Sequence, residues 1–343
     1  MAKSLRVRAG PLAFALPGRT IAVTAALILV VAAVMLLSLS RGTVAIGPGT
    51  VLQALLGQAE GPEGFVVNTL RLPRTVMAFL VGAALAVAGL ILQALVRNPL
   101  ASPDIIGISG GASVAAVAFL SFLAPQLGAQ WLPLFAIAGA LLAAAGIYLL
   151  AWRSGVTPAR LVLIGIGLSA AMGAATTLMI TLSPIATTMT AYIWLTGSVY
   201  GSDWADVQAL LPWLALLLPL ALRHARAIDL QEFGDTLATG LGLPVQRNRL
   251  LLLVLSVALA GVAVAHAGAI GFVGLMAPHI ARRLVARQFA GLAPVTALIG
   301  GMLVVLADLV GRTLFAPLDV PAGVFVSAIG APFFIYLLFR QRF

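Results

Sequence analysis

The chain has 343 residues, of which 62% are hydrophobic and 9% charged, whereas soluble domains carry about 25% charged residues. Its mean hydropathy of +1.11 exceeds what ordinary soluble cores can bury. The formal charge of +10 comes from basic residues scattered between apolar runs, which excludes the basic stripe of a nucleic-acid-binding domain. There is no cysteine, so disulfides, thiolate metal sites and cysteine nucleophiles are excluded too. The composition predicts an all-α polytopic membrane protein in a lipid bilayer.

Residues 1–20 are predicted to form a cytoplasmic N-terminal tail, and residues 21–343 a single transmembrane domain. The first apolar run follows four basic residues, is about 20 residues long and lacks a small-residue cleavage pattern, so we expect it to be retained as a span. Nine further apolar segments follow between charged, Pro-rich or Gly-rich breaks, and the eighth of the ten is the shortest. The ten segments are 21–40, 72–96, 105–123, 132–152, 160–182, 206–222, 250–268, 270–284, 292–312 and 321–339.

The basic residues support ten spans. Cytoplasmic loops of membrane proteins carry an excess of Lys and Arg. With both termini in the cytoplasm, 16 of the 20 basic residues lie inside. Without the eighth span, a cluster of three arginines at 282–287 would lie outside and this bias would weaken. The four basic residues left on the outer side are Arg41, Arg71, Arg74 and Arg312.

The sequence offers little catalytic chemistry. A P-loop needs a lysine to reach the β- and γ-phosphates, and the only lysine is Lys3. The three histidines are too far apart for H-x-x-x-H, and no acidic cluster within the spans offers metal ligands. Asp308 is the only carboxylate expected well inside a span, and Arg312 follows at the spacing that lets the two pair on one helix face. This pattern favours a structural ion pair over a proton-coupling site, and it predicts a chain that is not an enzyme and binds no metal.

Several motifs in a fixed order resemble one family. They are RLPR at 71–74, RNPLASPD at 97–104 followed by GISGGAS, FGDTLATGLG at 233–242, GAIGFVGLMAPHIARRL from Gly268, and VPAGVFVSAIGAPFFIYLL from Val320. Together they are similar to the permease subunits of type II ABC importers, the FecCD-type permeases for ferric siderophores, haem and vitamin B12. The resemblance covers about residues 20–340.

This resemblance implies a ten-helix type II ABC importer permease fold in the bacterial inner membrane, with both termini cytoplasmic. It also implies three kinds of protein partner: a second permease subunit, identical or paralogous, two cytoplasmic ATPase subunits, and a substrate-binding protein outside. ATP would bind the ATPase subunits, so this chain would carry no cofactor of its own.

Two cytoplasmic sites follow from the resemblance. Asn98, Pro99 and Leu100 match the cytoplasmic gate, although a plain packing turn explains them equally well, because proline cannot continue a helix. The loop at about 223–249 matches the segment that couples to the ATPase, with a solvated connector as the alternative. Asp235 in this loop also stands at a helix start, where the helix dipole favours a carboxylate. The matched coupling positions are Gly234, Asp235, Thr236, Ala238, Leu241 and Gly242.

The third site, a docking surface for the substrate-binding protein, lies on the outer side of the membrane. In the family, the arginines matching Arg71, Arg74 and Arg312 meet acidic residues of the substrate-binding protein, and arginine forks suit such contacts. Anchoring of helix ends at lipid headgroups is the alternative, and Arg312 also competes for Asp308. The outer segment 184–204 carries aromatic residues suited to an interface belt, and it matches a short gating helix in relatives.

The predicted function is translocation of a ferric siderophore, with most resemblance to the ferric enterobactin permeases. Haem or cobalamin transport by the same architecture is the first alternative. An ion- or proton-coupled secondary transporter is the second, but it would require several buried acids where the sequence offers only Asp308.

Overall fold

A computed structural model describes residues 4–9, 12–59, 61–104 and 106–340. Strands β1 (Ser4–Ala9) and β2 (Leu12–Pro17) form an antiparallel hairpin within the predicted tail, with Ser4 paired to Pro17. All other regular secondary structure in the described residues is helical. Its α-helices are α1 (Gly18–Ser40), α2 (Pro48–Leu55), α3 (Pro62–Phe65), α4 (Leu72–Val96), α5 (Ile108–Ala118), α6 (Ala124–Leu127), α7 (Leu132–Ala151), α8 (Pro158–Leu182), α9 (Ile185–Thr196), α10 (Trp204–Arg223), α11 (Ala225–Glu232), α12 (Asp235–Gly240), α13 (Val245–Ala267), α14 (Val273–Leu284), α15 (Phe289–Leu314) and α16 (Ala322–Arg340).

Three short segments of π- or 3₁₀-helix extend these helices. Val66–Arg71 joins α3 to α4, Phe119–Leu123 follows α5, and Ala129–Trp131 precedes α7. With these extensions, nine helices within the described residues are long and apolar enough to cross a membrane. All nine correspond to predicted spans.

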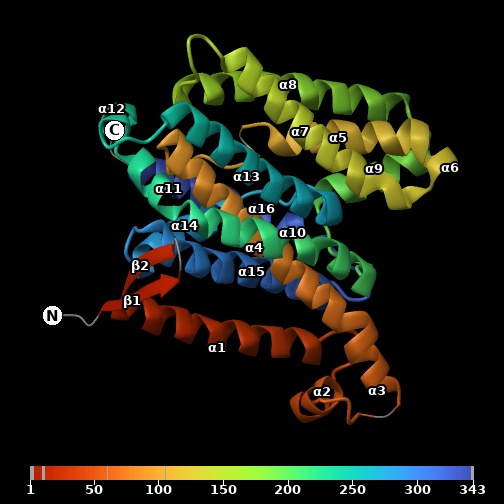
Figure 1. The fold of residues 1–343 in the computed structure, drawn as a ribbon. Coiled ribbons are helices and arrows are strands. Elements are labelled where there is room, and N and C mark those ends of the chain that lie inside the picture. Colours follow the sequence, from red (N-terminus) through yellow and green to blue (C-terminus); the bar gives the residue numbers. More distant parts are fainter. Residues whose placement is uncertain (1–3, 10–11, 60, 105, 341–343) are drawn as a thin grey trace.

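The predicted eighth span, 270–284, corresponds to α14. This helix has only 12 residues, about 18 Å at 1.5 Å per residue, against the roughly 30 Å of a bilayer's hydrocarbon core. The structure therefore confirms a helix in this segment but shows that α14 is too short to cross the hydrocarbon alone. Figure 1 shows β1, β2, α11 and α12 on one side of the molecule, and α2, α3 and α6 on the opposite side.

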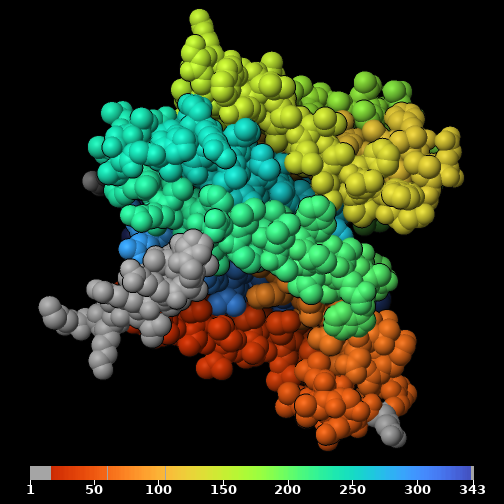
Figure 2. Space-filling view, viewed as in Figure 1, coloured from red at the N-terminus to blue at the C-terminus, as the bar shows by residue number. Residues whose placement is uncertain are grey.

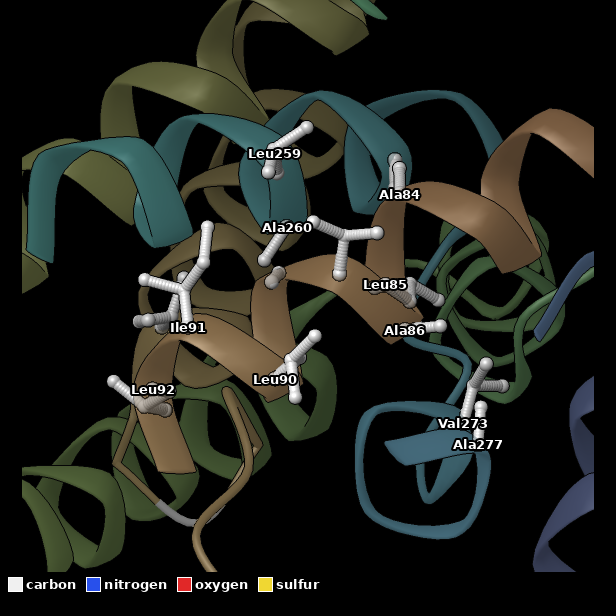
Figure 3. Packing of buried hydrophobic residues seen from close by; sticks show 14 of the residues in the cluster. Ala84, Leu85, Ala86, Leu90, Ile91, Leu92, Leu259, Ala260, Val273 and Ala277 are labelled. Carbon is white, nitrogen blue, oxygen red and sulfur yellow. The ribbon is translucent and has the colours of Figure 1, made fainter. Parts of the chain in front are cut away.

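Helix α4 is the centre of the fold. It packs against α13, α14 and α15, and almost all of its residues are buried. Small residues permit close contact between apolar helices. A Cβ at Gly82 would overlap the carbonyl of Gly300 in α15, and one at Gly89 would overlap the carbonyl of Gly274 in α14. Figure 3 shows this packing, with α4 side chains between those of α13 and α14.

The peripheral helices bury much less. In α1 and α8 most of the membrane-spanning residues remain accessible in the isolated chain, including Leu29, Leu163 and Leu182. Exposed apolar faces on this scale mark surfaces that contact lipid or another protein. The central helices therefore hold the fold together, and the outer helices present apolar faces to the bilayer or to another subunit.

Candidate functional site

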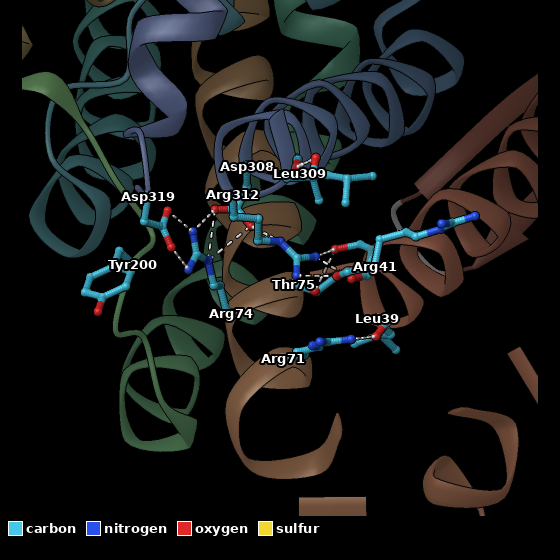
Figure 4. Close-up of polar contacts among 12 residues, drawn as sticks. Leu39, Arg41, Arg71, Arg74, Thr75, Tyr200, Asp308, Leu309, Arg312 and Asp319 are labelled. Atoms are coloured by element: carbon cyan, nitrogen blue, oxygen red, sulfur yellow. Dashed lines mark hydrogen bonds and ion pairs between the residues drawn. The ribbon is translucent and has the colours of Figure 1, made fainter. Parts of the chain in front are cut away.

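The outward arginines lie in one cluster at the outer ends of α4 and α15, which Figure 4 shows. Arg74, in the first turn of α4, has two carboxylate partners. Its Nη2 lies 2.7 Å from Asp308 Oδ1, and its Nη1 lies 2.7 Å from Asp319 Oδ2 in the loop between α15 and α16. The Arg74 guanidinium also lies 5.4 Å from the centre of the Tyr200 ring. Arg74 therefore ties the start of α4 to the end of α15, and bidentate pairs of this kind are directional as well as strong.

Arg71 and Arg312 hold the outer end of α1. Arg71 Nη1 donates to the carbonyl of Leu39 at 2.7 Å. Arg312 donates to the carbonyl of Arg41 and to the hydroxyl of Ser38, each at 2.7 Å. The last carbonyls of a helix have no partner within it, and positive charge is favourable there. Both arginines are nearly inaccessible, at 7% and 9% exposure, so they act first as internal caps of α1.

The predicted pair between Asp308 and Arg312 is present, with Arg312 Nε 3.4 Å from Asp308 Oδ2. The closer partner of Asp308 is Arg74, which sequence spacing did not indicate. Asp319 was also missed, because it is paired with a residue more than 200 positions away. The only signal that could have found it is its position beside the outward arginines in the predicted topology.

An outer cleft of about 530 Å³ is bordered by Arg71, Arg74, Arg312 and Asp319. Its wall is formed by residues 42–44, 69–71 and 200–203 together with Val66 and the loop after α15. Figure 2 shows the segments near residues 50–70 and 200–210 meeting at this end. Trp204 Nε1 donates to the carbonyl of Asn68 at 3.0 Å, which joins the two walls. The predicted short helix in the outer segment 184–204 is present as α9.

At the other end of α4, the predicted gate residues form a tight turn. Arg97 ends the helix in the left-handed conformation, with φ 56°. Asn98 Oδ1 accepts a hydrogen bond from the Leu100 amide at 2.9 Å, and Asn98 and Pro99 are exposed. This geometry is compatible both with a gate and with a packing turn.

The same turn contains a carboxylate that the sequence did not single out. Asp104 Oδ1 accepts from the Ser109 hydroxyl at 2.8 Å, and Asp104 Oδ2 accepts from the Phe272 amide at 3.2 Å. Asp104 therefore joins the turn after α4 to the start of α14. Its partner is more than 160 residues away in the chain, so no local pattern could have indicated this role.

The loop at 223–249 forms helices α11 and α12, separated by Gly234 with φ 99°. Asp235 is the first residue of α12, as predicted. Its Oδ1 lies 2.7 Å from Arg249 Nη2 and 3.8 Å from Arg97 Nη2. Arg249 is fully buried and also donates to the carbonyl of Val156. The carboxylate of Asp235 therefore fixes α12 to α13 and to the loop before α8.

Around this fixed point, α11 and α12 expose apolar side chains. Phe233, Leu237 and Leu241 are 67%, 60% and 65% exposed. Thr236 and Gly242 are exposed beside them, whereas Ala238 is buried against the rest of the protein. Phe233 and Leu237 were not among the predicted coupling positions, although apolar residues in an otherwise polar loop were the available signal. We name the patch of Phe233, Leu237 and Leu241 the α12 knob.

Within the described residues, no group of three or more His, Asp or Glu side chains could hold a metal ion. The chain instead has two separate surfaces at opposite ends of a helical bundle. One is the outer cleft with its paired charges, and the other is the apolar α12 knob. Together with the nine helices of the described residues that are long and apolar enough to cross a membrane, this arrangement is that of a multi-pass membrane protein.

Similarity to known proteins identifies the family. The FecCD transport family model matches residues 28–340, and the chain belongs to this family. It is 57% identical over 315 residues, covering 92% of this chain and 90% of the relative, to the achromobactin transport system permease protein of Dickeya dadantii (strain 3937). It is 39% identical over 303 residues, covering 88% of this chain and 91% of the relative, to the ferric enterobactin transport system permease protein of Escherichia coli (strain K12).

A solved structure has the same fold. It is described as an inward-facing conformation of a metal-chelate type ABC transporter, and it matches with a TM-score of 0.81 and 28% identity, covering 94% of this chain and 100% of that one. The predicted recognition and fold class are confirmed. A FecCD permease with these apolar helices is a multi-pass protein of the bacterial inner membrane.

Proposed function

We propose that this chain is the transmembrane permease subunit of an ATP-binding cassette importer that carries a ferric siderophore into the cytoplasm. The observation that carries the proposal is the match of nearly the whole chain to permeases of siderophore uptake systems. The 57% identity to the achromobactin permease makes ferric achromobactin the first chelate to test, ahead of ferric enterobactin. The chain itself hydrolyses no ATP, because its only lysine, Lys3, lies in the predicted tail and cannot serve a P-loop.

The α12 knob is proposed as the contact with the ATPase. Exposed apolar side chains beside a helix that is fixed by ion pairs suit a rigid knob that enters a cleft of a partner. In this proposal Asp235 keeps α12 in place through Arg249, and the residues around it form the coupling loop of 223–249 within one transmembrane domain, 21–343.

The outer cluster is proposed as the docking surface for a substrate-binding protein. Arg74 and Asp319 border the open cleft, while Arg71 and Arg312 hold the end of α1 behind them. A partner carboxylate that reaches Arg74 would compete with Asp319, so docking would change the contacts between α4 and the loop after α15. The turn of Asn98, Pro99 and Leu100 is proposed as the cytoplasmic gate between this chain and a second permease.

The test is uptake of radiolabelled ferric achromobactin, ferric enterobactin, haem and cobalamin in cells that lack their own permease. The chain is expressed with its partner permease, ATPase and binding protein, and the Arg71→Glu/Arg74→Glu variant runs in parallel. We expect ferric siderophore uptake that needs the ATPase and is lost in the double variant. Membrane abundance is measured on the same cells, and uptake is expressed per permease in the membrane, because both arginines also make contacts within the chain.

Other outcomes separate the alternatives. Uptake that persists without the ATPase and follows the proton gradient would contradict the ABC importer proposal. Uptake of haem or cobalamin in place of every ferric siderophore would keep the architecture and replace the substrate. Full uptake by the double variant would remove the arginines from the docking surface and leave the rest of the proposal intact.

A further inference from the structure

Helix α15 lacks a cap from its own sequence and receives one from α11. Its N-cap residue, Gln288, makes no side-chain hydrogen bond to the first turn. Instead Asp229 Oδ1 accepts a hydrogen bond from the Phe289 amide at 2.8 Å. The first amides of a helix need such acceptors, and a carboxylate there is the favoured one. The first residue of α15 is therefore held by a side chain from another helix.

A second carboxylate lies on the same face of α11. Glu232 follows Asp229 by three residues, a spacing that places both on one side of a helix. Glu232 is exposed as a residue, but the neighbouring protein partly desolvates its carboxyl and so raises its pKa, while the positive charges of Arg282 and Arg287 act in the opposite direction. These two arginines stand at the end of α14 and in the short loop before α15. Asp229 thus contacts the corner where α14 turns into α15, and Glu232 lies on the same acidic face of α11.

Helix α11 is also anchored in the rest of the protein by buried side chains. Ala225, Ile228 and Gln231 are fully buried, and Gln231 Oε1 accepts from Asn248 Nδ2 of α13 at 3.1 Å. The next turn of the chain carries the α12 knob. A force applied to the knob would therefore act on α11 as a packed unit, and through its acidic face on the corner of α14 and α15.

Helix α15 continues from this corner to the outer cluster. It has 26 residues, about 39 Å at 1.5 Å per residue, enough to cross the membrane. Its far end carries Asp308, the partner of Arg74, and Arg312, which caps α1. Figure 1 shows α15 running between the side that holds α11 and α14 and the opposite end of α1. Helix α15 therefore connects the hydrogen bond between Asp229 and the Phe289 amide to the outer cleft.

We propose that Asp229, supported by Glu232, is the positioning residue that couples α11 to α15, so that displacement of the α12 knob by the ATPase moves the outer end of α15 and opens or closes the outer cleft. Asp229 touches neither substrate nor nucleotide and acts through the Phe289 amide. This inference rests on the proposed function, because it assumes that the knob is where an ATPase acts.

The experiment uses the complete transporter in proteoliposomes. Because the chain has no native cysteine, Leu318→Cys gives one thiol in the outer cleft, at a position that is 70% exposed. Its labelling by a membrane-impermeant maleimide is compared with and without ATP and vanadate in three backgrounds: wild type, Asp229→Ala and Asp229→Asn. Asparagine is the matched control, since its amide oxygen can still cap the Phe289 amide. Basal ATPase activity and substrate uptake per ATP are measured on the same samples.

We expect nucleotide to change the labelling rate in wild type and in Asp229→Asn, and to leave it nearly unchanged in Asp229→Ala. Uptake per ATP should fall about 5-fold or more in Asp229→Ala, the usual lower range of an allosteric coupling, with basal ATPase activity retained. Full nucleotide-dependent labelling and wild-type uptake in Asp229→Ala would overturn the proposal. A loss of equal size in Asp229→Asn would also overturn it, because the cap would then not be the cause.

A second variant covers failure of the first to assemble. Glu232 is exposed, so Glu232→Gln should fold normally and give a smaller loss of nucleotide-dependent labelling in the same direction. Wild-type behaviour of Glu232→Gln, with Asp229→Ala unassembled, would count against the proposal. If wild type itself binds no ATPase, the proposed function has failed, and this outcome is distinct from a complex that binds and hydrolyses ATP but does not couple.

Discussion

The two ends of this bundle are built in opposite ways. At the outer end, Arg71, Arg74 and Arg312 are paired with carboxylates or helix-end carbonyls within the chain, and most of their surface is covered. At the cytoplasmic end, the ionic groups around Asp235 are equally well paired, but the α12 knob leaves three large apolar side chains exposed. The charged groups of the outer surface are therefore paired within the chain, whereas the cytoplasmic surface exposes apolar side chains of the kind that contact another protein.

This difference predicts different consequences of mutation. Breaking the outer cluster should damage the fold of the chain itself, because it leaves charges buried without partners. Changing the knob should leave the chain stable and weaken only its association with the ATPase. The predictions below test that contrast at both ends.

The largest effect on the stability of the chain is expected for Asp308→Ala. This change removes the partner that Arg74 and Arg312 share, and an unpaired buried charge typically destabilises a protein by about 3–5 kcal/mol. We expect a marked fall in the thermal unfolding midpoint of the detergent-purified chain, with reduced membrane abundance.

Asp319→Asn is the matched control at the same arginine. Asp319 is more accessible than Asp308, and exposed ion pairs contribute about 0–1 kcal/mol. We expect its unfolding midpoint to remain close to that of wild type. Equal loss in the two variants would show that burial does not govern the stability of the outer cluster.

An intermediate effect is expected for Arg249→Met at the cytoplasmic end. The change removes the buried donor of the Asp235 carboxylate and leaves the Val156 carbonyl only its longer hydrogen bond from Gln246 Nε2, which should destabilise the chain by about 1–3 kcal/mol. Limited proteolysis of the 223–249 loop should report faster cleavage. Arg97→Gln serves as the comparison, since its 3.8 Å contact with Asp235 is partly exposed and its loss should barely change the cleavage rate.

The sequence predicted those features that depend on local composition. Apolar runs of about 20 residues identified the long helices, and the bias of basic residues isolated Arg71, Arg74 and Arg312, which the structure brings together with Arg41. Both signals work because the bilayer imposes one length and one charge asymmetry on every span.

The features that the sequence did not predict depend on tertiary contacts. Asp319 and Asp104 gain their roles from partners more than 160 residues away, and no periodicity or spacing reports such distances. The sequence predicted the eighth span as the shortest, but it did not show that α14 begins only at Val273, because hydropathy continues through the non-helical residues 268–272 before it. The docking, coupling and gate roles of the named residues stay predictions until partners are bound.

The smallest effect on the chain itself is expected for Leu237→Ser in the α12 knob. Leu237 is 60% exposed, so the unfolding midpoint should stay within error of wild type, as for most surface substitutions. Binding to the purified ATPase should weaken by about tenfold or more, because an apolar anchor at the centre of an interface contributes well over 1 kcal/mol. Leu56→Ser, at a leucine that is 71% exposed at the outer end of the bundle, should change neither property. A knob variant that binds the ATPase as tightly as this control would place the coupling surface elsewhere, and the contrast between the two ends would then lose its functional meaning.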